Sequence, residues 1–144
     1  MLVTTLTASN LTVNSNLNVL LGSVGIGKSN PAYKLDVVGD IYASGNVIAY
    51  SDIRQKENIV NIESALDKVL HLRGCTYTKI GDDSHKKYVG VIAQELQEVL
   101  PEAVSSDQDG MLSVAYGNIT ALLIQAIKEL SGRVDEIAAR LPAA

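Results

Sequence analysis

The sequence contains no tryptophan, no phenylalanine and only one cysteine, Cys75. Its aromatic residues are all tyrosines, so any core must be built from Leu, Ile, Val and Ala. A single cysteine excludes a disulfide framework within the chain. No apolar run approaches the roughly 18 residues that a membrane-spanning helix needs. Basic runs are also absent and the net charge is -4, so we expect neither nucleic acid nor a membrane as a partner.

What is present divides the chain into two parts of different composition. Residues 1–50 are rich in Thr, Ser, Asn and Gly, and their apolar residues form short alternating pairs, which predicts short strands joined by tight turns. These pairs are Leu11/Val13, Leu17/Val19, Val24/Ile26, Leu35/Val37, Ile41/Ala43 and Val47/Ala49. Such small pairs cannot enclose a core against the entropy lost on ordering the segment. We therefore expect an intertwined β-stem shared by several copies of the chain, with a disordered tail as the alternative.

Residues 51–144 have the pattern of a globular α+β domain. We expect a helix over 62–72 capped by Asn61, followed by a hairpin in which 75–80 pairs with 87–93. A short helix over 94–100 should end at Pro101, and 103–114 should form two strands joined by a turn at Asp109–Gly110. A long helix should then run from Asn118 to about Leu141. Together with the stem, these elements predict a mixed α/β domain that ends in a long C-terminal helix.

The last expected helix carries an apolar seam with heptad spacing. Its members are Leu123, Ile127, Leu130, Val134, Ile137 and Leu141, at intervals of 4, 3, 4, 3 and 4 residues. This spacing is typical of a coiled coil between chains. Three heptads are few, so packing of the same face against its own domain remains an equal alternative.

The stretch GSVGIGKS, residues 22–29, fits the phosphate-loop pattern G-x-x-x-x-G-K-[ST]. A phosphate loop needs a helix that begins at its lysine, here Lys28, and aims N–H groups at the phosphate. Pro31 and the β-branched pair before Gly39 leave room for one or two helical turns at most. We interpret the match as accidental and keep a nucleotide hydrolase as a minor alternative.

A second stretch, SDIRQKEN at residues 51–58, allows two interpretations. Asp52 with Gln55 three positions later forms a capping box, so the stretch could simply start a helix. Alternatively, the hydroxyl of Ser51 and the amine of Lys56 could act as nucleophile and base. Residues at this spacing meet only if Ser51 lies in extended chain and Lys56 on the first turn after it. A lysine base must also be desolvated or lie beside another cation, such as Arg54.

The sequence SDIRQKENI resembles the signature S-D-x-R-x-K-x-N-I of the intramolecular chaperone auto-processing domain. This domain occurs in phage tailspikes and tail fibres, among them the endosialidase tailspike, and in myelin regulatory factor. The similarity continues through ALDKVLHLRGCTY, GVIAQELQEVLPEAV, LSVAYGNI and LLIQAIKEL, and so covers nearly all of residues 51–144. The segment from Val24 to Asp52 is similar to the fibre sequence that precedes such domains.

The resemblance implies a self-processing serine endopeptidase of a Ser–Lys type. By this match Ser51 is the nucleophile and Lys56 the general base, while Asp52, Arg54 and Asn58 are supporting residues. The domain is expected to trimerise, to guide folding of the fibre stem in residues 1–50 and then to cut itself off. Its partners are its own copies and the upstream fibre. The fibre would belong to a virion after assembly in the host cytoplasm, with the chaperone part released.

One departure from the family leaves an alternative open. Family members often have His two residues before the Gly of the G-x-I-A-Q-E block, whereas this chain has Tyr88. If that His assists catalysis, cleavage here would be slow or absent. The alternative function is therefore a structural trimerisation cap that does not cleave.

Ring size favours one scissile bond. The Oγ of Ser51 reaches the carbonyl of Tyr50 through a five-membered ring, an N-to-O acyl shift. Attack on its own carbonyl, which would cut Ser51–Asp52, needs a strained four-membered ring. We therefore expect cleavage at Tyr50–Ser51, although attack from a neighbouring chain keeps the second bond possible.

We expect no metal and no cofactor. His71, Cys75 and His85 lack a fourth ligand and are split between a helix end and a loop. Asp107 and Asp109 precede Gly110 as turn residues do, without the spacing or the closing Glu of a calcium loop.

Overall fold

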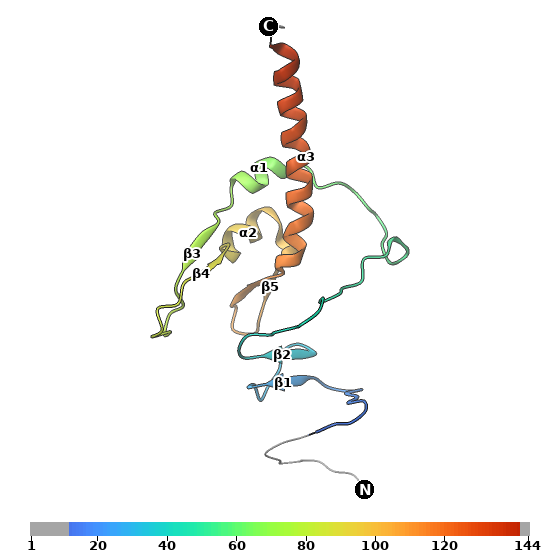
Figure 1. Ribbon diagram of the computed structural model, residues 1–144, viewed down its shortest axis with the longest axis vertical. Helices are drawn as coiled ribbons and strands as arrows, with labels where there is room; N and C mark the ends of the chain where they lie inside the picture. The colour runs from blue at the N-terminus through green and yellow to red at the C-terminus, as the bar shows by residue number, and fades with distance from the viewer. Residues whose placement is uncertain (1–11, 142–144) are drawn as a thin grey trace. The chain divides into compact units, whose positions relative to one another are not determined.

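The structure is a computed structural model that describes residues 12–141 (Figure 1). Its contacts divide the chain into two units, residues 1–50 and residues 51–144. The secondary structure is mixed, with small two-stranded sheets and a long C-terminal helix. This confirms the predicted combination of α and β elements, while the trimeric stem stays a prediction.

The first unit contains two short strands, β1 (Val24–Ile26) and β2 (Leu35–Val37), which pair in parallel. The loop between them is closed by Asp36, whose Oδ2 accepts from the backbone N–H of Ala32 at 2.9 Å and pairs with Lys28 Nζ at 2.9 Å. These bonds, first that of Lys28, lower the pKa of Asp36. No helix begins at Lys28, as a phosphate loop would require.

At the other apolar pairs predicted for this unit, the described residues of the single chain form no strand. Leu11, a member of the first pair, lies outside the described residues. A pair of apolar residues buries too little surface to hold a strand unless another strand lies beside it. No residue from 12 to 50 is buried, and Leu21 is 93% exposed. In one chain, strands thus form at two of the predicted pairs, and the shared stem stays a prediction.

The second unit has the following elements in order: η1 (Ile53–Gln55), α1 (Ala65–Leu70), β3 (Cys75–Tyr77), β4 (Tyr88–Gly90), α2 (Ala93–Val99), η2 (Pro101–Ala103), β5 (Val104–Ser106), β6 (Leu112–Val114) and α3 (Tyr116–Arg140). The pairs β3–β4 and β5–β6 are antiparallel hairpins, as predicted. Gly110, at φ +79°, and the Asp107 side chain form the turn of the second hairpin. Pro101 follows the end of α2 and opens the 3₁₀ turn η2.

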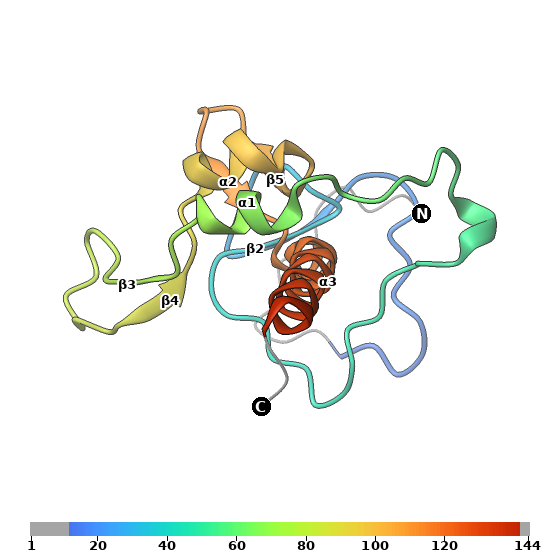
Figure 2. The ribbon, with the colours of Figure 1, turned by 90° about the horizontal axis from the view of Figure 1, so that it is seen from above.

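The core of this unit lies along the N-terminal half of α3, against α1 and α2 (Figure 1). One cluster consists of Ala65, Leu66, Leu122 and Ala126, and the other of Leu96, Ala103 and Ile119. Beyond these residues α3 continues past α1, and every residue from 131 to 141 is exposed. Figure 2 shows the same helix end-on, with α1 and α2 on one side of it.

Both predicted helix caps are wrong. Helix α1 begins at Ala65, well after Asn61, and its N–H groups are capped from α3. The carboxylate of Glu129 accepts from the backbone N–H of Ala65 at 2.9 Å and of Leu66 at 2.8 Å. Helix α3 begins at Tyr116, so Asn118 lies inside its first turn. The residue before the helix is fixed to η2, because the backbone N–H of Ala115 donates to the carbonyl of Ala103 at 2.8 Å, and α3 therefore starts before Asn118.

Candidate functional site

The segment from Ser51 to Lys56 forms a single tight turn. Asp52 is extended, at φ −63° and ψ 134°, and η1 follows it. The backbone N–H of Gln55 donates to the Asp52 carbonyl at 3.1 Å, and that of Lys56 donates to the Ile53 carbonyl at 3.1 Å. The turn is a 3₁₀ turn and does not continue into the α-helix that the capping-box interpretation predicts.

This turn brings the side chains of Ser51 and Lys56 together. Lys56 Nζ donates to Ser51 Oγ at 2.9 Å. Ser51 lies directly before the turn, next to the extended Asp52, and Lys56 lies directly after it, so one turn brings the two residues together. A neutral amine at this distance could take the hydroxyl proton and leave an alkoxide nucleophile.

Asp52 and Arg54 hold the turn from outside. Asp52 Oδ1 accepts from the backbone N–H of Arg54 at 2.9 Å and from its Nε at 3.0 Å, while Oδ2 pairs with Nη2 at 2.6 Å. This two-pronged pair, first through the Arg54 side chain and then through its backbone N–H, lowers the pKa of Asp52. In turn it raises the pKa of Arg54. Asp52 therefore does cap the turn, and the charge of Arg54 is compensated by Asp52.

The site is open to solvent in the single chain. Ser51 is exposed, and so is every residue from Ile53 to Asn61. The chain first meets the core at Ile62, which packs against the cluster around Leu122. Water around an ammonium group stabilises its charged form, so this chain by itself does not supply the desolvation that a lysine base needs.

Asn58, the last polar residue of the signature, has a left-handed backbone with φ +52°. Within the described residues its side-chain amide makes no hydrogen bond. Sequence reasoning grouped Asn58 with the supporting residues and did not foresee its backbone conformation.

Tyr88 belongs to the β3–β4 hairpin and makes its contacts there. Its ring stacks on Tyr77 with centroids 5.7 Å apart, and its hydroxyl donates to Asp82 Oδ2 at 3.3 Å. The amines of Lys79 and Lys86 lie 4.4 and 5.0 Å from the ring centroid. These contacts lie within the hairpin, so Tyr88 has a local structural role in this chain.

The residues considered for metal binding lie in separate settings. His71 Nδ1 lies 2.7 Å from the Asp67 carbonyl, and the thiol of Cys75 lies 3.5 Å from the carbonyl of Gly90. His85 is in the loop of the first hairpin at φ +53°. Across residues 12–141 no group of three His, Cys, Asp or Glu side chains is placed to hold a metal ion. No helix in the same range is long and apolar enough to cross a membrane.

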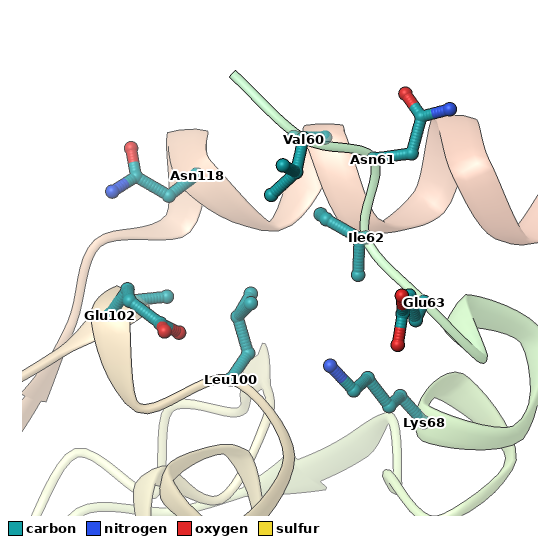
Figure 3. A pocket seen from close by; sticks show the side chains of 10 residues that line it. Val60, Asn61, Ile62, Glu63, Lys68, Leu100, Glu102 and Asn118 are labelled. Carbon is teal, nitrogen blue, oxygen red and sulfur yellow. The ribbon is translucent and has the colours of Figure 1, made fainter. Parts of the chain in front are cut away.

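A cavity of about 570 Å³ lies between the segment that leads into α1, the η2 turn and the start of α3 (Figure 3). Val60, Ile62 and Leu100 form its apolar lining. The side chains of Glu63 and Lys68 lie at one end and that of Glu102 at the other (Figure 3). None of the signature residues from Ser51 to Asn58 lines this cavity.

Several known proteins are similar in sequence to this chain. Residues 51–105 match the model of a peptidase family described as chaperone of endosialidase. The long tail fiber protein Gp37 of Enterobacteria phage K3 is 43% identical over 115 residues, which are 72% of this chain and 9% of that protein. Gp37 of phage Ox2 is 34% identical over 145 residues, 87% of this chain and 58% of that protein. Myelin regulatory factor homolog 1 of Caenorhabditis elegans is 36% identical over 129 residues, 79% of this chain and 14% of that protein. The chain thus spans less than two thirds of each of these relatives.

Proposed function

Because residues 51–105 belong to the chaperone-of-endosialidase family, as the signature predicted, we propose that residues 51–144 are a self-cleaving chaperone of a phage tail fibre or tailspike. In this proposal three copies associate, guide the folding of the β-stem that precedes them and are then released by cleavage at Tyr50–Ser51. The stem remains on the virion, and assembly takes place in the host cytoplasm. The family itself implies peptidase-type self-cleavage.

The observation that carries the proposal is the 2.9 Å contact between Lys56 Nζ and Ser51 Oγ within the family signature. A neutral Lys56 would take the Ser51 proton while Oγ bonds to the carbonyl carbon of Tyr50. The C–N bond then breaks, and the departing Ser51 nitrogen takes the proton back from Lys56. This leaves an ester between Tyr50 and Ser51 Oγ. Water hydrolyses the ester, which releases the Tyr50 carboxylate and restores the serine hydroxyl.

Assembly would complete this site. In one chain both reacting side chains are exposed, so the amine is well solvated. Burial of Lys56 under a neighbouring copy would disfavour the ammonium form and leave a neutral base. We therefore expect cleavage to follow assembly, and this order would keep the chaperone attached until the stem has formed.

Helix α3 offers a surface for that assembly. One face of α3 packs into the core of its own domain through Ile119, Leu122 and Ala126. The heptad seam lies beside this face and remains exposed, from 44% at Leu123 to 67% at Leu141. Packing against its own domain therefore does not use the seam, which supports the alternative that the seams of several chains form a coiled coil.

The second candidate function is a trimerisation cap that does not cleave. The contacts of Tyr88 favour it, because they all lie within the β3–β4 hairpin and none of them reaches the Ser51–Lys56 turn. Both candidates use the same fold and the same assembly surface. They differ only in whether the chain is cut.

The test is the mass of the purified chain under denaturing conditions. We expect two fragments that meet at Tyr50–Ser51 in the wild type and one intact chain for Ser51→Ala. Lys56→Arg keeps the positive charge, but a guanidinium cannot lose its proton near neutral pH and so cannot act as the base. We therefore expect its cleavage rate to fall by about 10²–10⁴-fold. Ser51→Ala and Lys56→Arg should still assemble. An intact wild-type chain would support the cap, and normal cleavage by Lys56→Arg would contradict the Ser–Lys mechanism.

A further inference from the structure

Asn58 differs from the other signature residues in how its side chain is used. Within the turn Lys56 contacts Ser51, and Arg54 contacts Asp52. The amide of Asn58 contacts no polar partner in the described part of the chain, and the residue is exposed. Its distinguishing property is its backbone, which has φ +52°.

This conformation explains why an asparagine occupies the position. An L-residue in the left-handed region brings its Cβ close to the carbonyl oxygen, which most side chains avoid. Asn is several-fold enriched there, and glycine adopts it freely. A β-branched or long side chain at this φ is disfavoured.

The bend at Asn58 lies between two fixed points of the chain. On one side, the backbone bonds of the 3₁₀ turn hold Lys56 against Ser51. On the other side, Ile62 packs against the core beside α1 and α3. The direction in which the chain leaves Lys56 is therefore set at Asn58, and with it the position of the Ser–Lys loop relative to the α3 surface.

We infer that Asn58 is a positioning residue that acts through its left-handed backbone and not through its amide. The inference rests on the proposed function, since it concerns where the loop that cleaves is held. It predicts that what matters at position 58 is the freedom to adopt positive φ. A hydrogen-bonding side chain at that position is not required.

Two substitutions separate a backbone role from an amide role. Asn58→Gly removes the amide but keeps the left-handed conformation, so we expect cleavage within about threefold of the wild-type rate. Asn58→Gln keeps the amide but loses the preference for positive φ, and we expect a decrease of about 5- to 30-fold. An amide role would reverse this order, with the Gly variant inactive and the Gln variant partly active.

The experiment compares these variants as full-length chains. The cleaved fraction is followed by denaturing mass spectrometry, and light scattering on the same samples shows that each variant assembles. Glu57→Gln is the matched control, because residue 57 is the exposed neighbour without positive φ, and we expect it to cut at the wild-type rate. Asn58→Val, which is β-branched, should be at least as slow as Asn58→Gln.

Each outcome decides the inference. Fast cleavage by the Gly variant with slow cleavage by the Gln and Val variants supports it. If the wild type cuts but Asn58→Gly does not, the amide is required and the inference is overturned while the proposed function stands. Normal cleavage by Asn58→Val overturns it in the same way. A wild-type chain that stays intact overturns the proposed function, and the inference falls with it.

Discussion

Residues 12–50 and residues 51–141 are both rich in aliphatic side chains, yet only the second part buries any of them. In the first part the apolar residues come in pairs, the two strands have three residues each, and nothing is buried. In the second part the long helix α3 packs its Leu122 and Ala126 against Ala65 and Leu66, and its Ile119 against Leu96 and Ala103. Apolar content alone therefore does not produce a core. A core also needs an element long enough to bring distant segments to one face.

The largest expected effect comes from separating the two parts. Residues 1–50 made as a separate peptide should not refold from denaturant, because they have no core to offset the entropy of ordering. The intact chain should recover a β-rich signal under the same conditions. Circular dichroism after dilution from urea measures both. If the isolated peptide refolds to a β-rich oligomer, the comparison and the chaperone proposal are both wrong.

The second effect concerns the face of α3 that its own domain leaves exposed. Ile127 is 65% exposed in the single chain, and Ile127→Glu would place a carboxylate in each seam of an assembled trimer. Burying unpaired charges costs several kcal/mol, so we expect the variant to be monomeric at micromolar concentration. Ala139→Glu adds the same charge to an exposed position of the same helix outside the seam and should still assemble.

Sedimentation velocity distinguishes these two variants. A monomeric wild type, or an Ile127→Glu variant that assembles like Ala139→Glu, would show that the seam is not the assembly surface.

A third prediction compares one leucine from each part. Leu122 is fully buried, so Leu122→Ala should lower the free energy of unfolding by about 2–5 kcal/mol. Leu20 is 87% exposed, and Leu20→Ala should change it by less than about 0.5 kcal/mol in a monomeric chain. Urea unfolding below and above the assembly concentration gives both values. A clear loss for Leu20→Ala only in the assembled protein would show that neighbouring chains bury the stem.

A fourth prediction concerns the cap that α3 supplies to α1. Glu129→Ala removes the acceptor for the N–H groups of Ala65 and Leu66 and should lower the free energy of unfolding by about 1–3 kcal/mol. Glu136→Ala on the same helix removes an exposed carboxylate and serves as the control, with an expected change below about 0.5 kcal/mol. Equal values for the two variants would contradict the capping role.

The smallest effect is the acid sensitivity of the turn at the site. The pKa of Asp52 lies below its ordinary value of 3.8 because the side chain and backbone N–H of Arg54 bond to it. Because the folded pKa is lowered, the Asp52–Arg54 pair stabilises the turn fully above about pH 3.8. This stabilisation is lost as the pH falls through the pKa that Asp52 has in the folded chain. Cleavage near neutral pH should therefore not respond to Asp52 titration. An NMR titration of Ser51→Ala should show the Asp52 midpoint below 3.8, and the added change Arg54→Ala should move it upward.

Short-range signals predicted much of the second part. Pro101 does end α2, the Asp109–Gly110 turn does join two strands, and two hairpins form where alternating residues flank polar loops. The conditional prediction that Ser51 and Lys56 meet across one turn agrees with their 2.9 Å contact, whereas their catalytic roles stay predictions. These features depend on residues close together in the chain, and so their physical causes can be seen in the sequence.

Long-range contacts account for what was wrong. Asn61 and Asn118 looked like caps, but α1 is capped by Glu129, which is 64 residues away from Ala65, and α3 starts where Ala115 bonds to Ala103. No local pattern marks Glu129 as a cap, because it is one of many charged residues on a helix surface. The strands expected at the other apolar pairs of residues 12–50 do not form in one chain for a related reason, since their pairing depends on strands that one chain does not place beside them.

The sequence by itself showed that residues 51–105 resemble the chaperone-of-endosialidase family, which their signature residues carry. It also determined the two-part composition, the hairpins and the spacing that lets Ser51 reach Lys56, because each of these follows from neighbouring residues and their steric preferences. Only the tertiary structure decided which face of α3 enters the core and which stays exposed, that Glu129 caps α1, and that Asn58 turns the chain with φ +52°. Burial and long-range hydrogen bonds depend on where distant segments come to lie. The heptad spacing can be seen in the sequence. Its exposure depends on the tertiary structure, because Ile119, Leu122 and Ala126 face the core and residues 131–141 extend beyond it.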